Sequence, residues 1–175
     1  FAPVRRVLRR RAIWLGINLM TAFAAAAVIN MFEAAIVKVV ALAVLMPVIA
    51  SMGGIAGTQT LTLVIRGQAL GQINRRNILW MLNREFLIAA LNGTLWATLV
   101  AIAAAVFFAD PLLGWVIATA MIITILVAAI AGSLLPGLLR MLGVDPAIAG
   151  GVVVTTITDV VGFFVFLGLA SLVYL

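Results

Sequence analysis

Five long stretches of the chain are apolar almost without interruption, and each is long enough to cross a lipid bilayer as a helix. A transmembrane helix needs about 20 consecutive, mostly apolar residues. The runs that meet this length cover residues 12–31, 34–65, 78–108, 112–139 and 146–174. Continuous apolar runs of this length predict membrane-spanning helices rather than strands. The pattern therefore predicts an all-α membrane protein with five transmembrane helices.

The second of these runs is too long for a straight helix that crosses the membrane without tilt. It contains Pro47 and three glycines, Gly53, Gly54 and Gly57. Helix kinks form at proline and at some glycines, and a helix that is longer than the bilayer is thick tilts to fit it. We therefore expect a kink or a tilt in the second span.

The composition supports a membrane setting and narrows the possible chemistry. Hydrophobic residues make up 66% of the chain and charged residues 9%, whereas soluble domains are about half apolar and a quarter charged. The chain has no cysteine and no histidine, which excludes disulfides, thiolate sites and histidine-based acid–base chemistry. A metal ion would meet only oxygen ligands, which suit hard cations such as Mg²⁺ or Ca²⁺. The sequence contains no nucleophile–base set and no phosphate-binding loop, so we expect neither an enzyme nor a bound cofactor.

The basic residues predict how the chain is oriented in the membrane. If the N-terminus is cytoplasmic, every basic residue except Lys38 lies inside; these residues are Arg5, Arg6, Arg9, Arg10, Arg11, Arg66, Arg75, Arg76, Arg84 and Arg140. Cytoplasmic loops of membrane proteins carry such an excess of Lys and Arg. The net charge of +6 therefore indicates topology rather than a nucleic-acid partner. We expect a multi-pass protein of the inner (plasma) membrane with its N-terminus inside and its C-terminus outside.

Asp159 is the one acid that lies deep within a predicted span. It falls about 13 residues into the fifth run, which is roughly 20 Å along a helix and near the middle of the membrane. A central Asp costs about 2.5–3.5 kcal/mol to insert, and such residues face a bundle interior or a water-filled cavity. No Lys or Arg lies at a comparable depth in any predicted span. Two interpretations remain: a cation or proton site, and a protonated Asp hydrogen-bonded across a helix interface.

Small and polar residues form one face of the fifth span and one face of the second. The first face holds Gly151, Thr155, Asp159 and Gly162, and the second holds Ser51, Gly54, Thr58 and Thr62. Such faces could line a pore, but small residues also let helices pack closely, and Gly53 and Gly57 have the spacing of a GxxxG packing motif. One carboxylate per chain provides few ligands for a divalent ion. A two-fold dimer would bring two copies of Asp159 to a shared axis.

The other acids lie at or near the ends of predicted spans. Asp145 is followed by Pro146, and it could either cap the fifth helix through its side chain or bind an ion at the cytoplasmic mouth of a pore. Glu33 is expected at a solvated helix end. Arg84 and Glu85 lie near the start of the third span, where we expect helix-end and lipid-headgroup electrostatics.

Four motifs, taken in order, resemble the transmembrane domain of the MgtE magnesium transporters. They are Pro47-x5-Gly53-Gly54-x2-Gly57-x-Gln59, Leu63-Val64-Ile65-Arg66, Gly143-Val144-Asp145-Pro146 and Thr155-Thr156-Ile157-Thr158-Asp159-Val160-Val161-Gly162. The resemblance covers essentially the whole chain. It implies a homodimeric Mg²⁺ channel with its pore at the dimer interface, lined by the second and fifth spans. In that family pattern Asp159 would hold a largely hydrated Mg²⁺ with help from the Thr155 carbonyl, and Asp145 would be the acid near the cytoplasmic mouth.

The resemblance also has consequences for the organisation of the chain. Full-length members of the family carry a cytoplasmic N-domain, a pair of CBS domains and a long connecting helix. Residues 1–11 would be the end of that helix and residues 12–175 the transmembrane domain, so we expect the cytoplasmic regulatory domains to be missing from this sequence. Ile55 and Thr58 stand where family members usually or often carry Asn, and Gly151 stands where some members do.

The leading hypothesis for function is conduction of hydrated Mg²⁺ along its electrochemical gradient, with Asp159 as the selectivity carboxylate. Mg²⁺ would be the transported and bound ion rather than a cofactor. Two facing carboxylates favour a divalent ion over a monovalent one. The alternative is a proton- or Na⁺-coupled secondary transporter in which Asp159 is the titrating coupling site. A third possibility is a membrane scaffold that transports nothing and in which Asp159 only packs.

Overall fold

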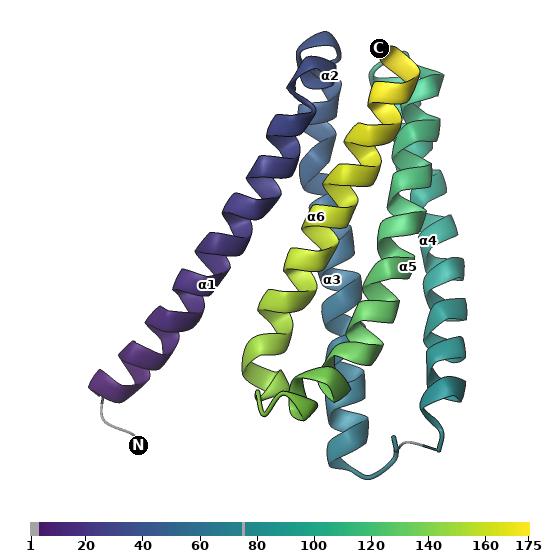
Figure 1. The fold of residues 1–175 in the computed structure, drawn as a ribbon. Coiled ribbons are helices and arrows are strands. Elements are labelled where there is room, and N and C mark those ends of the chain that lie inside the picture. The colour runs from purple at the N-terminus through teal and green to yellow at the C-terminus, as the bar shows by residue number, and fades with distance from the viewer. Residues whose placement is uncertain (1–3, 75) are drawn as a thin grey trace.

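A computed structural model describes residues 4–74 and 76–175, and nearly all of this part of the chain is helical. The helices are, in order, α1 (Val4–Met31), α2 (Glu33–Lys38), α3 (Ala41–Ala69), α4 (Ile78–Phe107), α5 (Pro111–Met141) and α6 (Pro146–Tyr174). All but the short α2 are long and apolar enough to cross a membrane. Within the described residues, the structure therefore confirms the predicted all-α architecture with five candidate spans (Figure 1).

Helix α5 is the central element of the bundle. It packs against α4, α3 and α6, and its buried residues include Leu113, Ile117 and Ala120. Helix α6 also packs against α3 and touches α1 and α2. Helix α1 contacts mainly α6, and Ala25 is its one buried residue among those described. Figure 1 shows α1 diverging from α6 toward the N-terminal end of α1, where a cavity of about 610 Å³ lies between the two helices.

The apolar run that was expected to form the second span is divided in two. Helix α2 ends at Lys38, Val39 has an extended backbone (φ −129°, ψ 85°), and α3 begins at Ala41. The interruption follows a stretch rich in β-branched residues, which lose side-chain freedom in a helix. The predicted kink site, Pro47, lies inside α3 in its second turn and does not end the helix.

Glycines bring α3, α5 and α6 into close contact. A Cβ added at Gly53 would lie 2.6 Å from the Thr124 Cγ2, and one added at Gly132 would lie 2.6 Å from the Gly57 carbonyl oxygen. A Cβ added at Gly57 would clash with the Val154 side chain. Since real Cβ atoms do not approach other atoms so closely, these positions need glycine. The packing interpretation of Gly53 and Gly57 is therefore confirmed.

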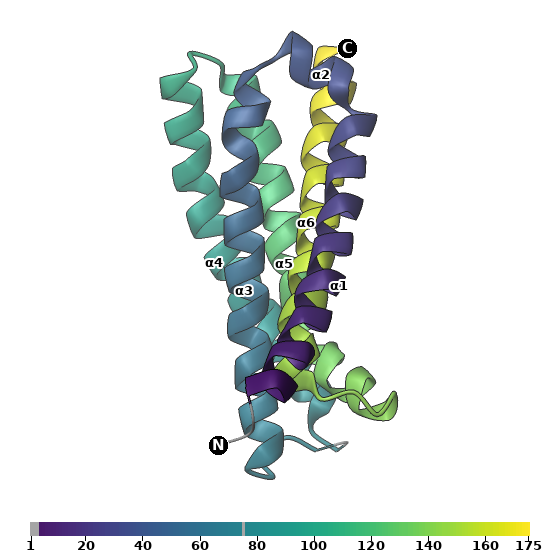
Figure 2. The ribbon, with the colours of Figure 1, turned by 90° about the vertical axis from the view of Figure 1, so that its left-hand side faces the viewer.

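The two ends of the bundle differ in charge. Helix α1 begins, α3 ends, α4 begins, α5 ends and α6 begins at one end, which we call the arginine-rich end (Figures 1 and 2). The described basic residues at this end are Arg5, Arg6, Arg9, Arg10, Arg11, Arg66, Arg76, Arg84 and Arg140, whereas Arg75 lies outside the described residues. The opposite end carries Lys38, Glu33 and Asp110. The fold thus gathers at one end the arginines that are dispersed in the sequence.

Candidate ion-binding site

Asp159 lies near the middle of α6, thirteen residues after Pro146, the first residue of the helix. Its side chain is half-buried. Within residues 4–74 and 76–175 it makes no hydrogen bond to another side chain and no ion pair, since the one ion pair in this part of the chain joins Arg84 to Glu85. A carboxylate at this depth without a cationic partner is costly in a bilayer. The charged form of Asp159 is therefore unfavourable unless a cation binds it, and the alternative is that Asp159 binds a proton.

The small and polar face of α6 continues from Asp159 toward the arginine-rich end. Thr155 and Gly151 are half-buried, and a Cβ added at Gly151 would meet nothing within 4 Å. The Thr155 hydroxyl donates to the Gly151 carbonyl at 2.9 Å. The Thr155 carbonyl, which the family pattern implies as an ion ligand, accepts a hydrogen bond from the Thr158 hydroxyl at 3.1 Å.

Helix α3 runs antiparallel to α6 and carries the matching face. A Cβ added at Gly54 would lie 3.7 Å from the Thr155 Cγ2, which fixes the register of the two helices. This register places Ser51 level with Asp159 and Thr58 level with Gly151. Ser51 and Thr58 are exposed. The structure thus brings together six of the predicted residues, and we call this set the polar strip: Ser51, Gly54 and Thr58 on α3, and Gly151, Thr155 and Asp159 on α6.

Two of the residues predicted to line a pore lie off the polar strip. Gly162 is buried, and a Cβ there would lie 2.9 Å from the Ile49 Cγ2 and 3.3 Å from the Thr124 Cγ2. It packs α6 against α3 and α5, which is why this position needs a small residue. Thr62 is exposed and lines a cavity between α3 and α4 together with Thr58.

Asp145 caps the beginning of α6. Its Oδ1 accepts a hydrogen bond from the Ala147 N–H at 3.0 Å, and Pro146 occupies the first turn, as is common after such a cap. The side chain is exposed at the arginine-rich end. Fourteen residues separate it from Asp159, which corresponds to about 21 Å along the helix. The capping interpretation is confirmed, and the two acids are too far apart to bind one ion.

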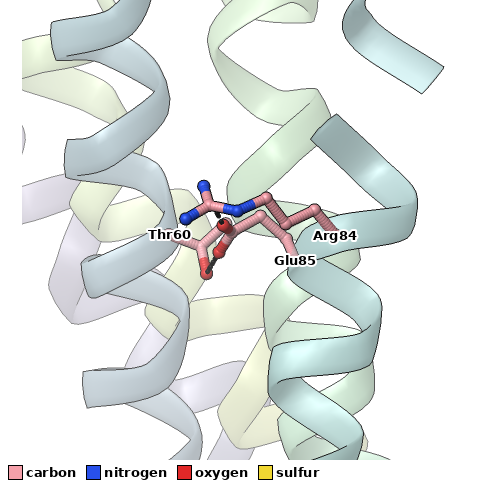
Figure 3. Close-up of polar contacts among 3 residues, drawn as sticks. All are labelled: Thr60, Arg84 and Glu85. Carbon is pink, nitrogen blue, oxygen red and sulfur yellow. Dashed lines mark hydrogen bonds and ion pairs between the residues drawn. The ribbon is translucent and has the colours of Figure 1, made fainter. Parts of the chain in front are cut away.

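Glu85 is the acid whose position the sequence did not reveal. It was expected to contribute helix-end and lipid-headgroup electrostatics, but only 7% of its surface is exposed. Its Oε2 accepts a hydrogen bond from the Thr60 hydroxyl of α3 at 3.3 Å, and its Oε1 lies 3.8 Å from the Arg84 guanidinium (Figure 3). That Oε1 is buried and has no hydrogen-bond partner in the part of the chain described. The expectation for Glu85 was therefore wrong.

The spacing of residues along α4 could have predicted that Glu85 is buried. From Met81 to Ala97 the buried residues of this helix recur at every fourth position and are Met81, Glu85, Ala89, Gly93 and Ala97; Ala104 is also buried. Residues four apart lie on the same face of a helix. Glu85 therefore belongs to the face of α4 that packs against α5, and from there it reaches Thr60 of α3. Its neighbour Arg84 points to the surface, with 52% of its side chain exposed.

Asp110 joins two helices at the opposite end of the bundle. Its Oδ1 accepts hydrogen bonds from the N–H groups of Leu112 at 3.0 Å and Leu113 at 3.2 Å, which caps α5. Its Oδ2 accepts a hydrogen bond from the hydroxyl of Tyr174 at the end of α6. The Tyr174 hydroxyl has the largest effect and lowers the pKa of the Asp110 carboxyl; burial raises this pKa by less, and the N–H groups of Leu113 and Leu112 lower it further.

No group of three or more acidic side chains that could hold a metal ion occurs among residues 4–74 and 76–175. A single chain therefore offers one carboxylate at mid-membrane depth and a row of hydroxyls and backbone oxygens beside it. Mg²⁺ keeps several of its waters and is commonly bound through one or two carboxylates. The polar strip fits a hydrated cation better than a fully dehydrated one.

The bundle and the polar strip define a polytopic helical membrane protein with one half-buried acid near mid-membrane on that strip. The chain belongs to the MgtE family, because residues 46–169 match the family model described as divalent cation transporter. It is 35% identical over 162 residues to the magnesium transporter MgtE of Bacillus subtilis (strain 168) and 32% identical over 162 residues to that of Thermus thermophilus. The Enterococcus faecalis protein of the same name is 32% identical over 163 residues.

These alignments cover 93% of this chain and 36% of each of the three relatives. The chain thus spans about a third of the length of the curated relatives it matches. The predicted resemblance to the MgtE family is confirmed.

Proposed function

We propose that this chain forms the ion pathway of a magnesium channel and that it works as a homodimer. In the proposed dimer the polar strips of two protomers face each other across a two-fold axis. Hydrated Mg²⁺ passes between them along its electrochemical gradient, and the two Asp159 carboxylates select for the divalent ion. The relatives in Bacillus, Thermus and Enterococcus are named magnesium transporters, which supports Mg²⁺ as the transported ion.

The observation that carries the proposal is the position of Asp159. It is a half-buried acid in the middle of a span, on the polar strip, and without a cationic partner in the described chain. Two such carboxylates on one axis attract a divalent ion more strongly than a monovalent one. Ser51 and Thr58 of the strip are exposed in one protomer, which supports a second copy as its cover. Asp145 lies at the arginine-rich end of the same helix and would add negative charge at the mouth of the pathway.

The orientation we propose follows from the arginine-rich end. This end faces the cytoplasm by the positive-inside rule, so that Mg²⁺ entering from outside passes Asp159 before it reaches Asp145. The membrane potential then drives the ion inward without a coupled proton or Na⁺. The side chains of the strip other than Asp159 are hydroxyls or hydrogen atoms, which hydrogen-bond water of the hydration shell and do not titrate in the physiological range.

The test is Mg²⁺ entry into liposomes that contain the purified protein, followed with an Mg²⁺-sensitive dye at a fixed membrane potential. We expect Asp159→Asn to lower the rate of entry by about tenfold or more, because it removes the charge and keeps the size. Glu33→Gln is the matched control, since it removes an exposed acid from the opposite end. Its entry rate should equal that of the unmodified chain. The oligomeric state of each variant is measured by light scattering to show that the dimer persists.

Two results would contradict the proposal. If Asp159→Asn conducts like the unmodified chain, Asp159 is not the selectivity site. If entry follows an imposed pH or Na⁺ gradient at zero membrane potential, transport is coupled rather than passive.

A further inference from the structure

A groove runs between α3 and α4 at the arginine-rich end. Its first part is a cavity of about 880 Å³ bounded by the last turns of α3, the connector that follows it and the first turns of α4. Among the charged residues of the described chain, Arg66 and Arg84 line this cavity, and no Asp or Glu does. Neither arginine belongs to the polar strip. The groove therefore presents positive charge beside the polar strip, with which it shares Thr58.

The two arginines are held differently. Arg84 lies 3.8 Å from the buried Glu85 carboxylate, and its guanidinium lies 6.0 Å from the centre of the Trp80 ring. These contacts leave about half of its side chain exposed, with donors free to bind an anion. Arg66 is exposed and has no ion pair within residues 4–74 and 76–175. The pair offers an arrangement of donors that suits a phosphate group.

The rest of the groove is lined mainly by apolar side chains, with Gln59, Glu85 and Asn92 among its polar residues, and it leads toward the middle of the membrane. A second cavity of about 550 Å³ continues along the same two helices, and Ile55, Gln59, Leu63 and Arg84 line both. It extends as far as Trp96. The twelve residues from Arg84 to Trp96 correspond to about 18 Å along α4, close to half the roughly 30 Å thickness of the hydrocarbon core. This length matches one acyl chain.

We propose that this groove is a binding site for an anionic phospholipid of the same leaflet. The phosphate lies between Arg66 and Arg84, and one acyl chain lies along the apolar groove between α3 and α4. Basic pockets between transmembrane helices at the cytoplasmic side commonly bind anionic headgroups. Trp80 is largely exposed at the same level and is placed as an interfacial anchor.

Charge complementarity favours a lipid over a second copy of this chain as the occupant. A second copy would have to bring an acid to the two arginines. The exposed Glu33 and the half-buried Asp110 lie at the opposite end of the bundle. Asp145 lies at the right end but caps its own helix. An anionic lipid brings its charge to this depth in any case, because its headgroup lies at the membrane surface.

The test is lipid retention by the purified chain, measured by native mass spectrometry after exchange into mixtures of phosphatidylglycerol and phosphatidylcholine. We expect the unmodified chain to retain phosphatidylglycerol in preference. Each arginine near a membrane surface contributes about a fivefold factor in affinity for anionic lipid. We therefore expect Arg66→Gln to weaken retention about fivefold and the Arg66→Gln/Arg84→Gln double variant about 25-fold.

The matched control is the Arg76→Gln/Arg140→Gln double variant, which removes two exposed arginines from the same end that do not line the first cavity. It should retain phosphatidylglycerol like the unmodified chain. Equal losses in both double variants would overturn the proposal, because they would show a general surface charge effect. Displacement of the lipid by millimolar inorganic phosphate would also overturn it in favour of a free-phosphate site.

A second copy of the chain in the groove can be told apart from a lipid by cysteine labelling and cross-linking. The chain contains no cysteine, so Leu70→Cys introduces a single thiol at the rim of the first cavity. We expect phosphatidylglycerol to protect this thiol from maleimide labelling. Disulfide-linked dimers that form equally with and without phosphatidylglycerol would show that protein covers the groove, and would overturn the proposal. None of these measurements uses Mg²⁺ flux, so their failure is distinct from failure of the proposed channel function.

Discussion

Asp159 and Glu85 both lie inside membrane-spanning helices, and the two carboxylates have different surroundings. Asp159 is half-buried on the polar strip with no partner in the described chain, whereas Glu85 is buried beside Thr60 and Arg84. A charge that is paired within the protomer holds helices together, and one that is left open can attract an ion. A carboxylate therefore serves packing in α4 and, in our proposal, selectivity in α6.

The hydrogen bond from Thr60 to Glu85 provides a test of this packing role. Replacing Thr60 by Val keeps the shape of the side chain and removes the donor, so that the buried carboxylate loses its one hydrogen bond of 3.3 Å. We expect the free energy of unfolding to fall by about 1 kcal/mol. Thermal unfolding in detergent, followed by tryptophan fluorescence, measures the change.

The matched control is Thr62→Val, because Thr62 is exposed on the same helix and makes no side-chain hydrogen bond to the described residues. It should unfold like the unmodified chain. Equal stability of the Thr60 and Thr62 variants would show that the bond to Glu85 contributes nothing.

The sequence allowed Asp159 to be found and left Glu85 misplaced for a physical reason. Depth in the membrane can be estimated from the distance to the ends of an apolar run, and Asp159 lies far from both. Glu85 lies only seven residues from Ile78, the first residue of α4, where either a solvated or a buried position is possible. Which one occurs depends on the helix face that meets α3, and that contact is a property of the tertiary structure.

At the scale of whole helices, the apolar pattern predicted that five spans exist more accurately than it predicted where each helix begins and ends. Five candidate spans were expected and are present in the described residues. The division of the second run at Val39 and the continuity of α3 through Pro47 could not be deduced from it. The residues on both sides of Val39 are apolar, so the hydropathy of the sequence does not reveal a short break between α2 and α3. Pro47 removes the one hydrogen bond that a residue at this position would donate to the Ala43 carbonyl, and the rest of α3 continues past it.

Two glycines of α5 provide a matched pair for testing the packing of α3 against α5. A Cβ at Gly132 would lie 2.6 Å from the Gly57 carbonyl oxygen and 3.0 Å from the Leu61 backbone nitrogen, and neither backbone atom can move independently. We expect Gly132→Ala to lower the free energy of unfolding by about 1–3 kcal/mol. A Cβ at Gly137 would meet nothing within 4 Å.

Gly137→Ala is therefore expected to leave the stability unchanged or to raise it by up to about 1 kcal/mol, since Ala favours helix. Thermal unfolding in detergent measures both variants. If Gly132→Ala is as stable as Gly137→Ala, the close approach of α3 and α5 is incorrect.

The bond between Asp110 and Tyr174 ties the beginning of α5 to the end of α6 and predicts a dependence of stability on pH. The pKa of Asp110 is lowered from its ordinary value of 3.8, chiefly by the Tyr174 hydroxyl. A carboxyl with a lowered pKa in the folded state stabilises the fold at pH values above the ordinary pKa. This contribution is lost as the pH falls below 3.8 and through the lowered value.

We therefore expect Tyr174→Phe, which removes the hydroxyl, to be less stable than the unmodified chain near neutral pH. The difference should shrink as the pH falls below about 4. Unfolding temperatures measured between pH 3 and 7 test this expectation. A difference that is constant over that range would show that the hydroxyl does not act through the charge of Asp110.

At the scale of the whole molecule, the distribution of charge links the fold to its membrane. The fold places the described arginines at one end of the bundle and Lys38, Glu33 and Asp110 at the other. An odd number of spans puts the two chain ends on opposite sides, and Figures 1 and 2 show the N- and C-terminal ends of the bundle far apart. The orientation, the direction of ion flow and the leaflet of the proposed lipid all depend on which end faces the cytoplasm.

The absence of cysteine from the sequence allows this orientation to be measured with single thiols. Met141→Cys places an exposed thiol at the arginine-rich end, and Leu175→Cys places one at the opposite end. We expect a membrane-impermeant maleimide to label Leu175→Cys in intact spheroplasts and to label Met141→Cys only after permeabilisation, because the positive-inside rule keeps the arginine-rich end in the cytoplasm. The unmodified chain gives the background. The reverse labelling pattern would place the arginines outside, and labelling of both thiols in intact spheroplasts would require an even number of crossings between them.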